Sequence, residues 1–564
     1  MKYRHGGRGV RGRLACAFVA YLASMIGGAS AAGAVEWKIG EVDVNVKTTA
    51  SVGVGIRMVN PDGDLISVLN GGRDTSIAAE NFDDGNLNYK RGDVYTTSTR
   101  MLHEVDIRWQ NLGAFSSFSY FYDFMNNDAE STRRTDLSHD ARQQAGRGID
   151  LYDAYVYGDF NVGGAPLTLR LGNQVINWGE ALFRPGGIAQ TNAIDISKLV
   201  TPGTNIREGY LPSPMIYANF SPVQGLGLEA YYEFEWRKTK LIPVGTFHST
   251  EDLLGDGNQG MFFAGDPGGT GLTPQQLFLT GTAIPRGPDD NPKNGGQYGV
   301  AARYFADDLA LEASLYYLRY HSKTPYLSGT AFCIISYLSC FVSVPTSYYA
   351  VYPEDNNLYG ASLSFPIGPV AIGAEASYQP RYPVMLADAV TAAITEAWIT
   401  GLPSSVDGVT YAKRWSYIGN AALTIGPNLG AIGQLPGWIG ADSMDLYGEA
   451  ALVSFAGDKP AGVTGDMSAW GLTTVASATY TNVLMSGLTL TPNVSFNYNV
   501  NGTAIDRSSA GTPIRGKRAV AVGVSANLRN TYSGSITYTN NMGGGLITRN
   551  SDRDFLTIAA AYSF

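Results

Sequence analysis

Cysteine and histidine are scarce in this sequence, and their scarcity limits the chemistry that the chain can perform. Among 564 residues there are three cysteines and five histidines, and the histidines lie on separate segments. Neither an HExxH metal-binding pair nor a GxSxG nucleophile motif occurs. We therefore expect no catalytic residue, no metal centre and no cofactor.

Only two cysteines remain beyond the amino-terminal segment, Cys333 and Cys340, seven residues apart in CIISYLSC. In an oxidising compartment we expect them to form a local disulfide. A metal pair is the alternative, but no nearby histidine or further cysteine completes such a site.

Charge is also sparse, because charged residues make up 16% of the chain. Residues 1–34 hold five basic and no acidic groups, an apolar run, LACAFVAYLASMIGG, and then small residues, which is typical of a secretory signal peptide. Without this segment the formal net charge changes from −9 to −14. An acidic exported protein is a poor partner for nucleic acid, so we expect none.

Apolar runs of about 20 residues are absent from the rest of the chain, which predicts no transmembrane helix. Instead, about eighteen short segments alternate apolar and polar residues, although sixteen is possible. Short turns such as NLG, ADD and MSG follow the even-numbered segments, and long loops follow the odd-numbered ones. One link on the short side, IGPNLGAIGQLPGWIGAD, is long and departs from this rule.

An even strand number with short turns at one end is typical of bacterial outer-membrane barrels. The last segment, FLTIAAAYSF, ends in Phe564 and resembles the assembly signal of such barrels. The sequence therefore predicts an all-β protein: residues 35–564 form a closed antiparallel transmembrane β-barrel with long extracellular loops. We expect it to lie among the lipids of a Gram-negative outer membrane.

The stretch LEAYYEFEWRK, residues 228–238, illustrates the alternation. The outer face of a membrane barrel meets lipid and carries aromatic girdles, whereas the inner face is polar. The residues predicted to face lipid or the headgroup boundary are Tyr232, Phe234 and Trp236. Those predicted to line the lumen are Glu229, Glu233 and Arg237, together with Arg170 on the strand LTLRLGNQ. Such lumen charges either set ion selectivity or form structural ion pairs, and the residues leave both interpretations open.

The loop after NQVINW is less polar than an ordinary exposed loop, since RPGGIAQTNAIDISKLVTPGTNIREGYLP contains several isoleucines and leucines. Loops that fold into some barrels narrow the lumen. We expect this loop to form a constriction above the charged wall. Its predicted substrate-path residues are Trp178, Glu180, Arg184, Pro185, Gly186, Gly187 and Ile188.

Two further loop features lead to weaker expectations. The segment PVMLADAVTAAITEAWITGLP has apolar residues at helical spacing and predicts a short amphipathic helix at the mouth of the barrel or inside it. The pieces NFDDGNLN and LLGDGNQG offer Asp83, Asp84 and Asp256 as calcium ligands. Neither completes an EF-hand loop, so we expect solvated turn residues there.

Four blocks of the chain resemble one known family: NFDDGNLNYKRGD, LRLGNQVINWGEALFRPGGI, NAIDISKLVTPGTNIREGYLPSPM and LEAYYEFEWRKTKLIPVGTF. This is the proteobacterial outer-membrane family catalogued as domain of unknown function 1302 (DUF1302). The resemblance covers nearly all of the mature chain, and the closing TNNMGGGLITRNSDRDFLTIAAAYSF is similar too. The CIISYLSC insertion and the predicted loop helix have no match.

The resemblance implies an exported barrel without established catalytic residues. It also implies partners, namely a periplasmic or outer-membrane lipoprotein and an RND-type transporter, and passage of hydrophobic small molecules that are lipid-, steroid- or aromatic-like. We therefore expect an outer-membrane transport barrel. The alternatives are a general diffusion porin and a non-conducting adaptor for a lipoprotein or an RND-type pump.

Overall fold

Eighteen antiparallel strands close into a barrel in the computed structural model, which describes residues 35–564 except 77, 337–338, 388–389, 391–392, 394–395, 398–401 and 507–511. The strands pair in chain order, and β26 (Phe555–Ser563) returns to pair with β2 (Val42–Arg57). The predicted fold class is confirmed. The other barrel strands are β3 (Val94–Trp109), β4 (Leu112–Asp123), β5 (Arg147–Val162), β6 (Ala165–Gln174), β9 (Ser213–Val223), β10 (Leu226–Glu233), β13 (Gln297–Ala306), β14 (Leu311–Tyr320), β17 (Asn356–Ile367), β18 (Val370–Met385), β20 (Val409–Ile425), β21 (Ser443–Ala456), β22 (Ser468–Thr481), β23 (Leu488–Asn501), β24 (Arg518–Leu528) and β25 (Tyr532–Met542).

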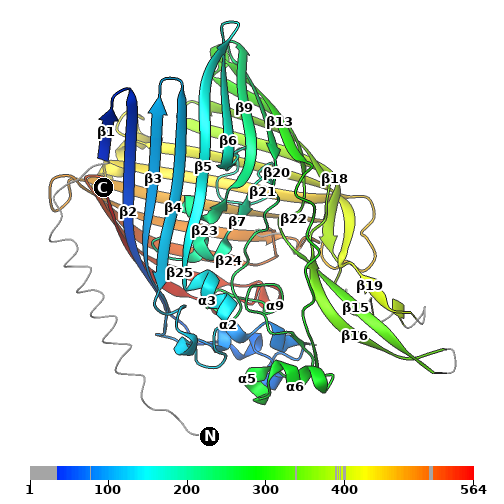
Figure 1. Ribbon diagram of the computed structural model, residues 1–564. Coiled ribbons are helices and arrows are strands. Elements are labelled where there is room, and N and C mark those ends of the chain that lie inside the picture. Colours follow the sequence, from blue (N-terminus) through cyan, green and yellow to red (C-terminus); the bar gives the residue numbers. More distant parts are fainter. Residues whose placement is uncertain are drawn as a thin grey trace.

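The short and long connections lie at opposite ends of the barrel. Figure 1 shows the tight turns after β3, β5 and β9 at the top and the loops that carry short helices at the bottom. The long link between β20 and β21 contains α8 (Leu435–Trp438). The short strand β1 (Val35–Ile39) pairs with the start of β2, which β26 leaves uncovered. Residues 1–34 lie outside the described part of the chain, so the signal peptide stays a prediction.

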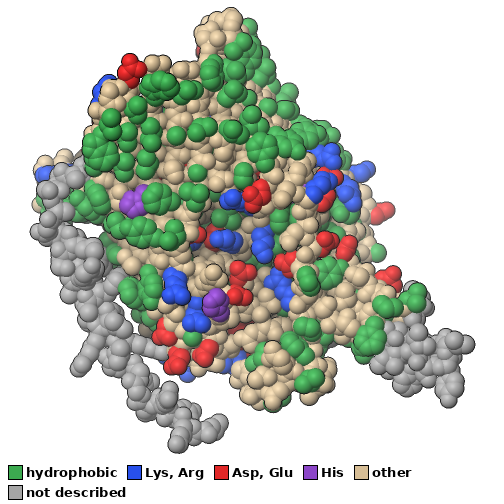
Figure 2. All heavy atoms as spheres, viewed as in Figure 1, with side chains coloured by type: hydrophobic (Ala, Val, Ile, Leu, Met, Phe, Trp, Pro, Cys, Tyr) green, Lys and Arg blue, Asp and Glu red, His purple; other side chains and the backbone are tan. Residues whose placement is uncertain are grey.

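The outer face of the barrel is apolar along the middle of the strands and aromatic near both ends. Exposed aliphatic side chains include Leu315, which is 65% exposed. Tyr298, Tyr317 and Tyr359 contact one another at the loop end, and Tyr532, Tyr562 and Phe564 do so at the turn end. In Figure 2 apolar side chains dominate the upper, strand-built part, while most charged ones gather toward the loops. This distribution is the one expected of a membrane barrel.

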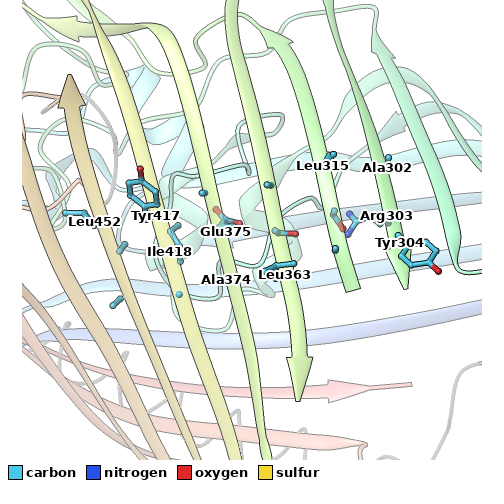
Figure 3. Close-up of a pocket in the computed structure, with 18 of the residues that line it drawn as sticks. Ala302, Arg303, Tyr304, Leu315, Leu363, Ala374, Glu375, Tyr417, Ile418 and Leu452 are labelled. Carbon is cyan, nitrogen blue, oxygen red and sulfur yellow. The ribbon is translucent and has the colours of Figure 1, made fainter. Parts of the chain in front are cut away.

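Small residues of neighbouring strands leave a shallow hollow of about 1170 Å³ in this outer face. Figure 3 shows Tyr304, Leu315, Leu363 and Tyr417 around it. Because successive residues of a strand point to opposite faces, the inward side chains of the same strands, such as Glu375, belong to the lumen. The hollow is thus part of the apolar outer surface.

The stretch LEAYYEFEWRK, residues 228–238, is a strand only in its first part. Strand β10 stops at Glu233, which pairs with Gln297, the first residue of β13. Tyr232 and Phe234 are exposed as expected. Trp236 is only 9% exposed, because its ring packs against Tyr352 within the loops and its Nε1 donates to a backbone carbonyl. The prediction that Trp236 faces lipid is therefore wrong.

Additional elements fold over the loop end of the barrel. A hairpin of β15 (Tyr326–Ser336) and β16 (Ser339–Val351) extends beyond the wall, and β19 (Ser404–Val406) joins it. The remaining helices and strands are α2 (Asp84–Leu87), α3 (His139–Ala145), α4 (Ile196–Val200), α5 (Pro267–Thr270), α6 (Pro274–Leu279), α9 (Gly545–Thr548), β7 (Ala193–Ile194), β8 (Tyr210–Leu211), β11 (Met261–Phe262) and β12 (Ala283–Ile284), with 3-10 turns η1 (Gly63–Leu65), η2 (Val68–Asn70), η3 (Ala79–Asn81), η4 (Ala129–Ser131), η5 (Ile206–Gly209), η6 (Asp307–Leu309) and η7 (Ile432–Gln434). Among the described residues, no helix combines the length and apolarity needed to cross a bilayer.

Four described residues of the predicted loop helix are helical: Val390, Ala393 and Ala397 are buried, and Glu396 is exposed. Ala393 and Ala397 pack with residues of β15 and β19, so this segment covers the hairpin. The side chains of Cys333 and Cys340, in β15 and β16, lie outside the described part of the chain. Their disulfide stays a prediction.

Candidate functional site: a loop across the lumen

The β6–β9 loop, residues 175–212, crosses the interior of the barrel. Its first half reaches β18, β21, β22 and β23 through hydrogen bonds. In the closed ring β23 lies ten strands from β6 in one direction and eight in the other, so these contacts are on the opposite wall. The loop therefore divides the lumen.

Two inward glutamates of the far wall hold the backbone of this loop. Glu375 on β18 accepts the N–H of Glu180 at 2.7 Å and that of Ile188 at 3.1 Å, one on each carboxylate oxygen. Glu449 on β21 accepts the N–H groups of Leu182, at 2.5 Å, and of the next two residues, at 3.0 and 2.6 Å. Both carboxylates are buried, and such groups are stable there when backbone donors satisfy them. These bonds fix the turn 180–188 against the wall.

The side chain of Arg184 extends this anchor to the next two strands. Its Nη1 donates to Asn499 Oδ1 at 3.0 Å, and its Nη2 donates to the Leu472 carbonyl at 2.8 Å. The adjacent turn needs glycine, since Gly187 has a positive φ of 64° and a Cβ there would collide with Glu375. Pro185 and Gly186 complete this turn, and Gly186 also has a positive φ.

The near side of the loop packs on an aromatic wall. Trp178 donates its Nε1 to Glu229 at 2.7 Å, and its ring lies 5.2 Å from the ring of Tyr231 and 5.7 Å from that of Tyr316. Glu229 also accepts from Arg303 at 2.6 Å, so this carboxylate is already paired. The buried apolar cluster at this contact, which we call the aromatic seam, comprises Ile176, Trp178, Ile188, Met215, Tyr217, Tyr231, Ala301, Tyr316, Leu318, Tyr320 and Leu358.

The second half of the loop presses on the wall formed by β2 to β5. Lys198 pairs with Asp150 at 2.9 Å, and Glu208 pairs with Arg100 at 2.6 Å. Gly53 on β2 faces the backbone of Pro202 so closely that a Cβ would collide with it. The loop is therefore anchored on both sides of the lumen.

Burial in the lumen changes the acidity of two loop side chains. Burial, together with the nearby Arg100, lowers the pKa of Lys198 to about 8, although Asp150 acts against this shift. Burial and the neighbouring Glu312 raise the pKa of Glu180. Among the carboxylates of the described residues 175–212, Glu180 is the one that is partly exposed and has a raised pKa.

The remaining predicted residues lie at different distances from the turn. Arg170 stacks over the rings of Tyr155 and Tyr217 on the wall. Glu233 is buried in a pair with Lys323 at 3.0 Å, near the loop end of β10. Arg237 follows the end of β10 and lies among the loops rather than on the strand wall. Its expected place in a lumen-facing strand is therefore wrong.

Sequence reasoning missed Glu375 and Glu449, which hold the loop in place. A signal was present, because each is the one glutamate of its strand and lies at an inward position, in VAIGAEASYQ and MDLYGEAALVSF. An inward acid must be satisfied by hydrogen-bond donors, and these can come from a loop elsewhere in the chain.

Comparison with solved structures places the chain beside outer-membrane porins at low similarity. OpdK of Pseudomonas aeruginosa has a TM-score of 0.42 and 10% identity, and the match covers 93% of this chain and 98% of that one. OmpF of Salmonella typhi, solved in complex with daunomycin, has a TM-score of 0.37 and 9% identity over 94% and 100%. OccAB1 of Acinetobacter baumannii has a TM-score of 0.40 and 8% identity over 93% and 97%.

No curated protein matches the sequence. A family model described as protein of unknown function (DUF1302) matches residues 15–564, nearly the whole chain. The resemblance found in the sequence is confirmed, and the protein belongs to the DUF1302 family.

Proposed function

We propose that the protein is an outer-membrane transport barrel for a hydrophobic small molecule, with the β6–β9 loop as the constriction on its path. The observation that carries this proposal is the aromatic seam between loop and wall. Aromatic and aliphatic side chains with a few fixed polar groups form the usual surface for an apolar ligand. In the seam, Glu229 holds the indole of Trp178 in place, and displacement of the loop would expose these buried rings to a passing molecule.

The anchored loop supports selective passage over general diffusion. A diffusion porin offers a water-filled lumen, whereas this lumen is crossed by a segment hydrogen-bonded to both walls. The proposed partners, a lipoprotein and an RND-type transporter, would exchange the molecule at the periplasmic end.

The conductance of the purified protein in a planar bilayer tests the constriction. Glu180 N and Ile188 N bind the two oxygens of one carboxylate, so the ends of the turn are close. Residues 181–187 can therefore be replaced by two glycines with little strain on either side. We expect the wild type to conduct weakly and this variant to open a large pore.

A wild type that already conducts strongly and steadily, with an unchanged variant, would favour the porin alternative. Silence of both proteins, together with a co-purifying periplasmic partner, would favour the adaptor.

Quenching of tryptophan fluorescence by a hydrophobic aromatic probe tests the substrate class. We expect the quenching by such a probe to contain a saturable component that Trp178→Phe removes. Trp438→Phe is the matched control, because Trp438 is 75% exposed on a turn-side link. Equal losses in both variants, or equal quenching by a polar solute of the same size, would argue against a hydrophobic path through the seam.

A further inference from the structure

Four aspartates from two loops converge at the loop end of the barrel, apart from the β6–β9 loop. Asp83 and Asp84 stand at the start of α2, Asp266 caps α5, and Asp252 lies in the long loop between β10 and β13. One carboxylate oxygen each of Asp83, Asp84 and Asp266 lies within 4.8 Å of the other two. We call these four residues the aspartate cluster.

The aspartate cluster differs from the expectation of solvated turn residues. Asp83 is fully buried, and Asp252 and Asp266 are buried too. The third aspartate beside Asp83 and Asp84 is Asp266 and not Asp256, which is exposed. Sequence distance explains the error, since Asp266 reaches the site only through the fold of a 63-residue loop, residues 234–296.

Positive charge around the aspartate cluster is smaller than its negative charge. Arg134 donates its Nη2 to Asp266 at 2.5 Å, while its Nη1 lies 3.6 Å from Asp84 and 3.9 Å from Asp83. Arg553 interacts with Asp252, but it interacts with the carboxylate of Asp552 as well. Neutral donors, including the side chain of Asn70, complete the contacts of Asp83 and Asp266. The carboxylates therefore outnumber the guanidinium groups at this place.

Asp252 provides a second and independent observation. It is 6% exposed, and its Oδ2 accepts the backbone N–H of Asp84 at 3.3 Å, so its carboxylate lies against the cluster. Its Oδ1 is buried and has no hydrogen-bond partner. A buried carboxylate oxygen without a donor is unfavourable unless a cation or a proton satisfies it.

We propose that the aspartate cluster binds one divalent cation, and that Ca²⁺ fits the site best. Ca²⁺ takes six to eight oxygen ligands in flexible geometry, whereas Mg²⁺ demands a near-ideal octahedron and retains its waters. Carboxylates from two loops, with the Thr135 hydroxyl beside them, form an irregular set of oxygen ligands. A bound cation would join the loops 58–93 and 234–296 over the outer mouth. This inference does not depend on the transport proposal.

Titration calorimetry with Ca²⁺ on the full-length protein in detergent tests the site, with EDTA-treated protein as the reference. We expect one Ca²⁺ per chain in the wild type, and an affinity weaker by roughly tenfold or more in Asp84→Asn and Asp252→Asn. Asp256→Asn is the matched control and keeps the wild-type affinity. No binding by the wild type, or unchanged binding by both cluster variants, would overturn the proposal.

A second measurement avoids variants that fail to fold. Limited proteolysis of the wild type should cut the loops 58–93 and 234–296 several-fold faster in EDTA than in Ca²⁺, while cleavage of the exposed link 426–442 stays constant. Equal cleavage of these loops in both conditions contradicts the proposed cation site and leaves the transport proposal untouched.

Discussion

The contact between Glu449 and the turn of the β6–β9 loop makes a quantitative prediction for the variant Glu449→Gln. The carboxylate accepts three backbone N–H groups, at 2.5, 3.0 and 2.6 Å. Hydrogen bonds to a charged group contribute about 1.5–3 kcal/mol each, and neutral ones about 0.5–1.5 kcal/mol. Glutamine has a single acceptor oxygen and turns its amide N–H₂ toward one of the three donors. We therefore expect the anchored state of the loop to lose about 3–5 kcal/mol.

Such a loss raises the ratio of released to anchored loop by roughly 10²- to 10⁴-fold, because each 1.4 kcal/mol is a factor of ten. Single-channel recording measures this ratio as the frequency and duration of openings. Asp445→Asn is the control, since Asp445 lies on the same strand as Glu449 and accepts a hydrogen bond from Thr424 of β20. An unchanged opening frequency in Glu449→Gln, with a correctly folded barrel, would refute the view that this carboxylate closes the lumen.

Three further predictions concern stability. Gly53→Ala should lower barrel stability by about 1–3 kcal/mol in urea unfolding, because its Cβ collides with the loop, whereas Gly419→Ala, with open space around it, should change little. Lys323→Ala should cost about 3–5 kcal/mol, because it leaves a buried acid unpaired, while Lys293→Ala breaks an exposed pair and should change stability little. The pKa of Asp84, raised to about 7, means that the folded loops favour the protonated form, so their stability is highest below about pH 4 and falls as pH rises through 7. Fluorescence-monitored melting in EDTA should therefore give a lower loop transition at pH 8 than at pH 5, and a higher one at pH 8 would contradict it.

The barrel could be predicted from the sequence because its signals are local. Alternation of period two, turn residues and loop lengths are each set within a few neighbouring residues, and eighteen strands with the expected order of connections result. The end of a strand is different, because it depends on where the partner strand begins. In β10 the alternation continues to Trp236, but β13 offers no partner beyond Glu233. The pattern therefore extends past the end of the sheet.

The constriction could be predicted only in part, because it depends on contacts between residues far apart in the sequence. The apolar character of the β6–β9 loop indicated a segment that leaves the solvent, and its distinctive turn drew attention to Arg184 and Gly187. Its partners are Glu375, Glu449 and Asn499, which lie hundreds of residues later in the chain. A single sequence does not show which inward acid binds which loop, because inward acids look alike on every strand and the backbone N–H groups of loops look alike too.

The two halves of the β6–β9 loop are held by different forces, and this difference indicates which half moves first. Buried hydrogen bonds to Glu375 and Glu449 hold the turn, and salt screens such contacts little. The second half includes the pair of Arg207 with Glu104, whose guanidinium side is 71% exposed and therefore weak and salt-sensitive. High ionic strength should loosen residues near Arg207 while the turn stays closed. We therefore expect hydrogen exchange in 1 M salt to increase at 203–207 but not at 180–188 or at Glu208, whose pair with Arg100 is buried, which would make the segment around Arg207 the part of the loop that moves first.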